Sequence, residues 1–136
     1  MVVARDIHGR LREAGYSSTR SRRVVLEALA RQPSQFTASE LFAAVEQRDS
    51  AIGRATVFRT LELLESLAIV ERIHGPHGCS TYTLCHHNQH HHHLICRICR
   101  QVVEVVGCGL SDLIQKVSEQ RGFAVEGHVV LSLIHI

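Results

Sequence analysis

The stretch from Cys85 to Cys99, CHHNQHHHHLICRIC, contains six histidines and three cysteines within fifteen residues. Imidazole nitrogens and thiolates are the protein ligands that zinc and related transition metals prefer. Cys96 and Cys99 have the C-x2-C spacing with which two thiolates hold one zinc ion, which then needs two further ligands. This density of ligands predicts metal binding. An expression tag is disfavoured because the histidine run is internal.

The four consecutive histidines, His90 to His93, lie between two strand-like segments. Neighbouring side chains of an extended backbone point to opposite faces. His90 and His92 would then share one face, and His91 and His93 the other. One short run is therefore able to serve two metal centres.

Catalysis has no support in the sequence. It contains no H-E-x-x-H pattern, no H-x-E paired with P-C-x-x-C, and no glycine-rich phosphate loop. We therefore expect a protein that is not an enzyme and has no small-molecule substrate.

The composition is that of a soluble globular protein of one ordinary domain or two small ones, with 136 residues, 45% of them hydrophobic and 21% charged. No apolar run approaches the roughly 20 residues of a membrane helix, and the N-terminus lacks the features of a signal peptide. We expect a cytoplasmic protein without a membrane partner. In that compartment its five cysteines are expected to be thiolates or metal ligands rather than disulfides.

The first half of the chain is predicted to be helical and to end in a hairpin. Thr37 and Glu40 form a capping-box pattern, Ser18 or Thr19 is placed to cap the preceding helix, and Gly15 is placed to end the first. Helical periodicity covers residues 4–14, 19–31, 37–48 and 55–67, followed by strand-like runs over 68–73 and 81–85. This order predicts a winged helix-turn-helix.

The second half is predicted to be a small α+β unit. Strand-like runs cover residues 93–99 and 101–106, a helix covers 109–122, and a last strand covers 123–134. So small a unit has little core of its own, so we expect it to dimerise or to be held by metal. The predicted organisation is a winged-helix DNA-binding domain (1–84), a hinge with metal ligands (85–92) and a dimerisation domain (93–136).

The chain resembles the ferric uptake regulator superfamily from about Arg5 to Val130. The resemblance is carried by IGRATVFRTLELLESLAIV, similar to the family's recognition-helix segment, and by HHHHLICRIC, similar to its histidine run and C-x2-C. It implies a homodimeric, metal-dependent transcriptional repressor. Such a repressor binds a palindromic, A·T-rich DNA operator when metal is abundant and releases it when metal is scarce.

The resemblance also bears on the metal. Iron-responsive members have a histidine where Gln35 stands and a glutamate where Thr83 stands. The regulatory ligands of the zinc-responsive branch are matched by Glu71, Cys85, His91 and His93, and Glu104 is a reserve candidate. A thiolate among the ligands suits zinc better than Fe2+. The resemblance therefore implies Zn2+ in regulatory and structural roles, with Fe2+ or Mn2+ less favoured.

A secondary family site is matched by His90, His92 and His128. Its carboxylate position holds Ser111, so the site is expected to have three ligands, to be weak, or to be completed by the adjacent Asp112 or by water. Cys79 and Cys108 match no family ligand and are expected to be buried or merely incidental thiols.

The family's structural zinc usually takes a second C-x2-C after the last strand, and the sequence contains no second pair. The closing residues LSLIHI resemble a translated sequencing adaptor. We therefore expect that the gene is truncated near Val130 and that Cys96 and Cys99 form half of a four-thiolate site.

The recognition helix carries the residues expected to contact DNA. Arg59 is placed to bind guanine in the major groove, and Phe58 is placed to contact a thymine methyl, unless it packs in the core. Further expected contacts come from Arg54, Thr56, Arg20, Arg22 and Arg23, the last three to phosphates. Residues 5–31 are rich in arginine. The alternative to DNA binding for this region is a solvated helix surface.

Two other functions remain open on the sequence. One is an iron, manganese or peroxide sensor of the same family, against which the missing iron-type ligands argue. The other is a zinc-storage or chaperone protein, which would leave the arginine-rich helices unexplained.

Overall fold

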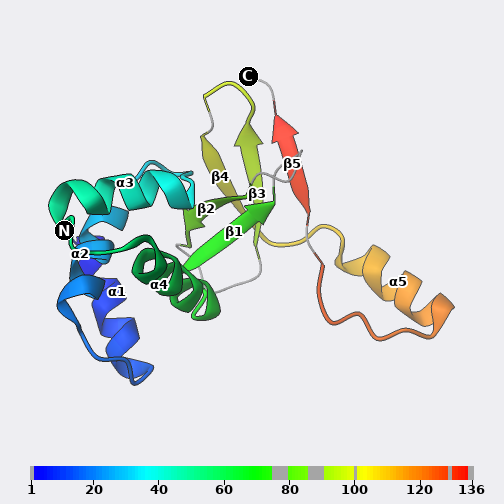
Figure 1. The fold of residues 1–136 in the computed structure, drawn as a ribbon. Coiled ribbons are helices and arrows are strands. Elements are labelled where there is room, and N and C mark those ends of the chain that lie inside the picture. The colour runs from blue at the N-terminus through cyan, green and yellow to red at the C-terminus, as the bar shows by residue number, and fades with distance from the viewer. Residues whose placement is uncertain (1, 75–79, 86–90, 100, 129, 135–136) are drawn as a thin grey trace. The chain divides into compact units, whose positions relative to one another are not determined.

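A computed structural model gives the fold (Figure 1) and describes residues 2–74, 80–85, 91–99, 101–128 and 130–134. The chain divides into two compact units, Met1–His86 and His87–Ile136. The division falls within the segment predicted to be a hinge.

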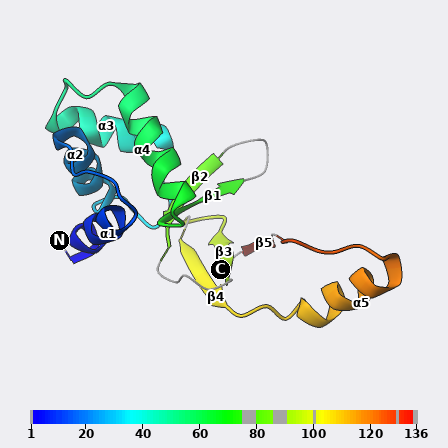
Figure 2. The same ribbon diagram turned by 90° about the horizontal axis from the view of Figure 1, so that it is seen from below.

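Within the described residues, the first unit contains four helices followed by a β-hairpin. Figures 1 and 2 show this order of elements along the chain. Its elements are α1 (Val2–Glu13), α2 (Arg20–Leu29), α3 (Ala38–Arg48), α4 (Arg54–Ser66), β1 (Val70–His74) and β2 (Ser80–Leu84). β1 and β2 pair antiparallel, with Glu71 opposite Thr83. This order confirms the predicted winged helix-turn-helix.

Local sequence determines where these helices begin. The Thr19 side chain accepts a hydrogen bond from the backbone N–H of Arg22 at 3.2 Å, so Thr19 caps α2. At α3 the Thr37 hydroxyl accepts from the backbone N–H of Glu40 at 3.1 Å, while the Glu40 carboxylate accepts from the N–H of Thr37 at 2.7 Å. The predicted capping box is confirmed, and it satisfies N–H groups that a helix start leaves without intrahelical partners.

The core of the first unit joins the helices to the hairpin. Phe36, just before α3, is fully buried, and its ring stacks on that of Tyr82 in β2 at 6.0 Å between centroids. The two residues also exchange backbone hydrogen bonds of 2.7 and 3.0 Å. Other members of this core include Leu26, Leu29, Leu41, Val45, Val57, Leu61, Leu64 and Val70. The helix that carries the expected DNA contacts is thus packed on a continuous apolar core.

The second unit contains β3 (His91–Cys96), β4 (Val102–Val106), α5 (Ser111–Arg121) and β5 (Leu131–Ile134). The sheet order is β4-β3-β5, with β3 antiparallel to β4 and parallel to β5. Gly122, with φ of 67°, ends α5 as predicted. The combination of helices and small sheets confirms the predicted α+β class.

The predicted last strand over residues 123–134 was too long. β5 begins at Leu131, and residues 123–128 form no regular secondary structure. The reason is the parallel pairing of β3 with β5, which requires a long crossover connection. Residues 123–128 are part of that connection because they lead the chain back from α5.

The second unit leaves much apolar surface exposed. α5 has no buried residue among its side chains. Large exposed apolar side chains on β4, α5 and the following segment are Val103, Val105, Val106, Leu113, Val117, Phe123 and Val125. An apolar surface of this kind is typical of a protein interface.

None of the helices in the described part of the chain has the length and apolar character that crossing a membrane requires.

Candidate metal centres and DNA-binding surface

The first group of metal-ligating side chains lies on β3 and β4. His91 and His93 are two residues apart on β3, with ring centroids 4.8 Å apart, and His93 pairs with Glu104 of β4 in the strand register. The three residues offer ligand atoms that all lie within 4.8 Å of one another. His93 is buried, and His91 and Glu104 are half-buried. The arrangement offers two imidazoles and one carboxylate, a donor set suited to zinc, iron or manganese.

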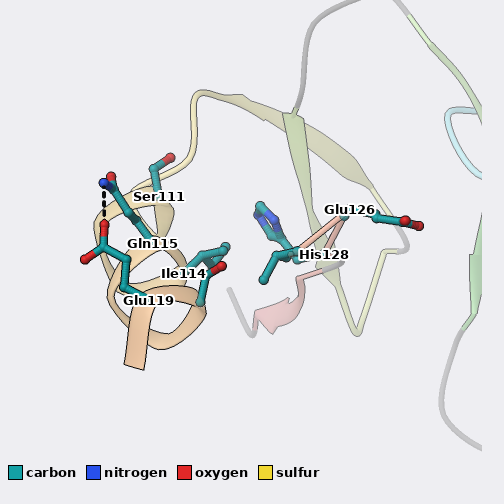
Figure 3. A pocket seen from close by; sticks show the side chains of 9 residues that line it. Ser111, Ile114, Gln115, Glu119, Glu126 and His128 are labelled. Atoms are coloured by element: carbon teal, nitrogen blue, oxygen red, sulfur yellow. Dashed lines mark hydrogen bonds between the residues drawn. The ribbon is translucent and has the colours of Figure 1, made fainter. Parts of the chain in front are cut away.

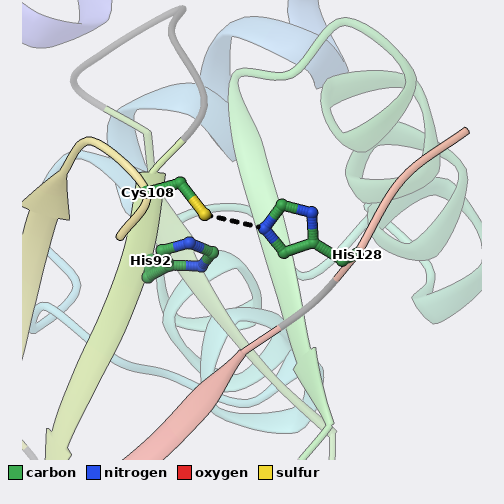
Figure 4. A group of neighbouring side chains, drawn as sticks. All are labelled: His92, Cys108 and His128. Atoms are coloured by element: carbon green, nitrogen blue, oxygen red, sulfur yellow. Dashed lines mark hydrogen bonds between the residues drawn. The ribbon is translucent and has the colours of Figure 1, made fainter. Parts of the chain in front are cut away.

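The second group contains His92, Cys108 and His128, whose side chains point toward one another in Figure 4. Their ligand atoms also lie within 4.8 Å of one another, and all three residues are half-buried. Cys108 Sγ is 3.1 Å from His128 Nε2, and the rings of His92 and His128 are 5.3 Å apart between centroids. His92 therefore belongs to a different group from His91 and His93, in line with the alternation of an extended strand.

Cys108 was predicted to be a buried or incidental thiol, and the structure brings it into this group of possible ligands. The available signal was its position two residues after β4, the strand that pairs with the histidine run. Of the other residues predicted for this secondary site, Asp112 is exposed in the first turn of α5 and belongs to none of the ligand groups among the described residues. His90 lies outside the described residues.

A shallow hollow of about 550 Å³ lies between α5 and the segment that follows it. In Figure 3 the His128 side chain is directed toward α5, whereas Glu126 extends to the other side of its segment. On the helix, Gln115 donates a hydrogen bond to Glu119 at 3.0 Å. The hollow shares His128 with the second ligand group.

The predicted regulatory site draws its residues from both units. Glu71 lies on β1 and Cys85 directly after β2, both half-buried. The Cys85 backbone N–H donates to the Ile69 carbonyl at 2.9 Å, which extends the pairing of the hairpin. His91 and His93 belong to the second unit. The four-residue site therefore stays a prediction.

Cys96 and Cys99 lie at and just after the end of β3. Cys96 is buried, and its N–H donates to the Gln101 carbonyl at 2.9 Å across the turn. Cys99 is an exposed thiol in that turn. Neither joins a group of three or more possible ligands among the described residues, so the structural zinc site stays a prediction.

Gln35 and Thr83, the positions where the resemblance places the ligands of iron-responsive regulators, form neutral hydrogen bonds. Gln35 Nε2 donates to Thr81 Oγ1 at 2.6 Å. The Thr83 hydroxyl, which is buried, donates to the Ser34 carbonyl at 2.7 Å. Both hydrogen bonds tie the segment before α3 to β2 within the first unit.

The residues expected to contact DNA lie on and around α4. Val57, Thr60, Leu61 and Leu64 are buried, whereas Arg54 and Arg59 are exposed. Phe58 is 37% exposed, so it does not pack in the core. The Arg54 guanidinium stacks 4.7 Å from the Phe42 ring centroid, and half-buried Thr56 accepts a hydrogen bond from Thr60 through its carbonyl at 2.8 Å.

Three arginines at the start of α2 are held by local contacts. Arg20 pairs with Asp49 at 3.0 Å. Arg22 donates to the Ser17 carbonyl and lies over the Tyr16 ring, and Arg23 donates to the Ser18 carbonyl at 3.1 Å. These contacts orient the guanidinium groups, and those of Arg22 and Arg23 leave their positive charge uncompensated.

Comparison with known proteins identifies the family. The model of the ferric uptake regulator family matches residues 13–132. The chain belongs to the ferric uptake regulator family. The ferric uptake regulation protein of Campylobacter upsaliensis is 30% identical over 122 residues, which cover 88% of this chain and 78% of that protein. The zinc uptake regulation protein of Mycobacterium tuberculosis is 33% identical over 117 residues, which cover 86% of this chain and 89% of that protein.

Solved structures show the same fold. The Vibrio cholerae ferric uptake regulator is 28% identical with a TM-score of 0.64, covering 93% of this chain and 96% of that one. A zinc uptake regulator in complex with zinc and DNA has a TM-score of 0.81 at 20% identity, and the match covers 98% of this chain and 89% of that one. At that identity the second likeness establishes the fold alone.

Membership of the ferric uptake regulator family establishes the general function. The chain is a metal-responsive transcription regulator that binds DNA as a dimer, and it is not an enzyme. Solved relatives include a zinc-bound manganese uptake regulator and a ferric uptake regulator with iron. The ion therefore has to be argued from the ligands of this chain.

Proposed function

We propose that this regulator is a zinc-responsive repressor that acts in the cytoplasm and binds a palindromic, A·T-rich operator as a homodimer. The observation that carries the proposal is the convergence of His91, His93 and Glu104 in the second unit, within reach of one metal ion. His91 lies within the predicted hinge, residues 85–92, and His93 directly follows it. A metal held there is in a position to couple the two units.

In the proposed regulatory site, Glu71 and Cys85 of the first unit join His91 and His93 of the second. Glu104 either completes this set or replaces Glu71 as its carboxylate. The Cys85 thiolate is the reason to favour zinc, because a soft sulfur ligand disfavours Fe2+ and Mn2+ relative to zinc. The half-buried side chain of Cys85, directly after β2, is consistent with such a role.

The hydrogen bonds of Gln35 and Thr83 support the choice of zinc over iron. Family members that respond to iron use a histidine and a glutamate at these positions. Neither an amide nor a hydroxyl supplies the charge or basicity that an Fe2+ site needs. In addition, both side chains are engaged with Thr81 Oγ1 and the Ser34 carbonyl.

We further propose that Cys96 and Cys99 contribute to a structural zinc site. Thiolates at C-x2-C spacing bind zinc tightly when two more ligands complete a tetrahedron. Burial of Cys96 at the end of β3 would shield such a site from solvent on one side.

The proposed switch acts by selecting one arrangement of the two units. Zinc binds more tightly to the DNA-competent arrangement than to the other arrangements. The ratio of these affinities sets how far zinc raises the population of the DNA-competent arrangement. In that arrangement Arg59, Phe58, Thr56 and Arg54 contact base edges and nearby backbone, while Arg20, Arg22 and Arg23 contact phosphates. Base contacts specify sequence, and phosphate contacts fix register.

The dimer is proposed to form through the second unit. The exposed apolar side chains of β4 and α5, among them Val105, Leu113 and Val117, would be covered by the second copy. A two-fold symmetric dimer presents two copies of α4, which explains a palindromic operator.

A titration of operator binding distinguishes the proposal from its alternatives. A labelled A·T-rich palindrome is titrated with protein at one stated salt concentration, in zinc, in Fe2+ under anaerobic conditions, in Mn2+, or in chelator. Tighter binding in zinc alone supports the proposal. A response to Fe2+ or Mn2+ but not to zinc indicates the other sensors of this family. Metal binding without operator binding indicates storage.

A further inference from the structure

We propose that His92, Cys108 and His128 form a thiolate-containing zinc site that holds both ends of the α5 crossover. This site lies entirely within the second unit and is separate from the regulatory site. The inference does not depend on the zinc-sensing assignment. It replaces the carboxylate expected for the secondary site with a thiolate.

The separations fit one tetrahedral ion. With Zn–S of about 2.3 Å and Zn–N of about 2.0–2.1 Å, neighbouring ligand atoms lie roughly 3.4–3.6 Å apart. Cys108 Sγ and His128 Nε2 are 3.1 Å apart, and all three ligand atoms lie within 4.8 Å of one another. To reach the zinc geometry, the Cys108–His128 separation would lengthen by a few tenths of an ångström, and no separation would change by more than about 1.4 Å. Half-burial of all three residues would restrict access of competing water.

The path of the backbone explains why these three side chains meet. His92 lies on the central strand, β3, and pairs with Val105 of β4. Gly107 has φ of 93°, a conformation that side chains disfavour, and it turns the chain directly before Cys108. His128 lies three residues before β5, which pairs with the other edge of β3. The three ligands therefore come from the central strand and from the segments on either side of α5.

The position of the ligands also suggests what the ion does. Cys108 precedes α5 by three residues, and His128 follows it by seven. α5 buries no side chain, so within the second unit it has little packing to fix it. An ion that joins Cys108 to His128 closes this crossover at its base and reduces the conformational freedom of the helix that carries Leu113 and Val117.

The donor set selects the metal class. Two imidazoles and one thiolate form a borderline-soft set that favours zinc over Fe2+, Mn2+ and Mg2+. Three protein ligands leave the fourth zinc position to water or to a residue outside the described part of the chain, such as His90. The family-type alternative, in which Asp112 supplies a carboxylate, would be harder and would bind Fe2+ or Mn2+ more readily.

The test follows alkylation of Cys108 in the full-length protein. Iodoacetamide modification of each cysteine is timed by peptide mass spectrometry, with zinc or with chelator. Zinc should slow modification of Cys108 by at least about tenfold because a coordinated thiolate is a poor nucleophile. In His128→Gln this protection should be lost, with sedimentation showing whether the dimer persists. Equal rates with and without zinc, or full protection in His128→Gln, would overturn the proposal.

Zinc stoichiometry provides a second, independent measurement. In Cys108→Ser, competition with a chromophoric chelator should show that one site binds zinc roughly 100-fold more weakly. Loss of a residue that only hydrogen-bonds to a metal ligand already lowers metal affinity by about 10–100-fold. Two variants serve as matched controls. Asp112→Asn removes the alternative carboxylate, and Cys79→Ser removes a thiol that belongs to no predicted site. Both should bind zinc as the unmodified protein does. Loss of a site in Asp112→Asn with none in Cys108→Ser would assign the carboxylate instead.

Discussion

His93 of β3 lies directly opposite Glu104 of β4 in the antiparallel register of the second unit. This pairing brings a carboxylate to an imidazole pair, because His91 lies on the same face of the strand two residues earlier. Glu104 was only a reserve candidate on sequence grounds. The register gives it a specific partner and makes it a ligand that can be tested.

Glu104→Gln should weaken metal binding at the His91–His93 site while the fold is retained. The amide keeps the size of the side chain but removes its negative charge, so we expect roughly a 10–100-fold loss of zinc affinity. Chelator competition measures the change. Glu46→Gln, at an exposed position of α3, is the matched control and should leave zinc affinity unchanged. Unaltered affinity in Glu104→Gln would remove this residue from the site.

Arg59→Ala should weaken operator binding and relax its sequence preference. Loss of a bidentate contact to guanine costs about 1–3 kcal/mol of binding free energy. Fluorescence anisotropy with the operator and with single-base variants measures both effects. Arg121→Ala, in the last turn of α5, is a control in the second unit. If Arg59→Ala binds all the variants with unchanged ratios, Arg59 does not specify a base.

Arg23→Ala should have a different signature. A phosphate contact weakens binding to all sequences about equally, and its loss lowers the slope of log affinity against log salt by about 1. Binding is measured at several salt concentrations on operator and non-operator DNA. A selective loss on the operator would show that Arg23 contacts a base.

Leu113→Asp should shift the protein from dimer to monomer. Leu113 is 57% exposed on α5, and a charge there would have to be desolvated in an apolar interface. Sedimentation velocity across a concentration series measures the dimer dissociation constant. Gln115→Asp introduces the same charge at a position about 200° around the helix from Leu113. This variant should therefore dimerise more tightly than Leu113→Asp. An unchanged dissociation constant for Leu113→Asp would place the interface elsewhere.

Features governed by neighbouring residues could be predicted from the sequence. Thr37 and Glu40 cap α3, Thr19 caps α2, and Gly122 ends α5, because each interaction spans only a few residues. The alternation of the histidine run likewise follows from strand geometry. For these elements, composition and spacing carry the physical information.

Features governed by distant pairing could not be predicted in this way. The last strand starts at Leu131 because β5 pairs in parallel with β3, a constraint that no local pattern contains. Cys108 and His128 are twenty residues apart in sequence, and their 3.1 Å contact depends on the turn at Gly107 and the crossover through α5. In contrast, the predicted joining of Glu71 and Cys85 to His91 and His93 depends on the arrangement of two units, and it stays a prediction.

The central claim is that zinc controls operator binding through Cys85. It is tested most directly by measuring operator affinity against buffered free zinc for the unmodified protein, Cys85→Ser and the control Cys79→Ser. We predict that zinc tightens operator binding in the unmodified protein and in Cys79→Ser, and that Cys85→Ser loses most of this response while remaining folded. A normal zinc response in Cys85→Ser, or a response of the unmodified protein to Fe2+ and not to zinc, would contradict the claim.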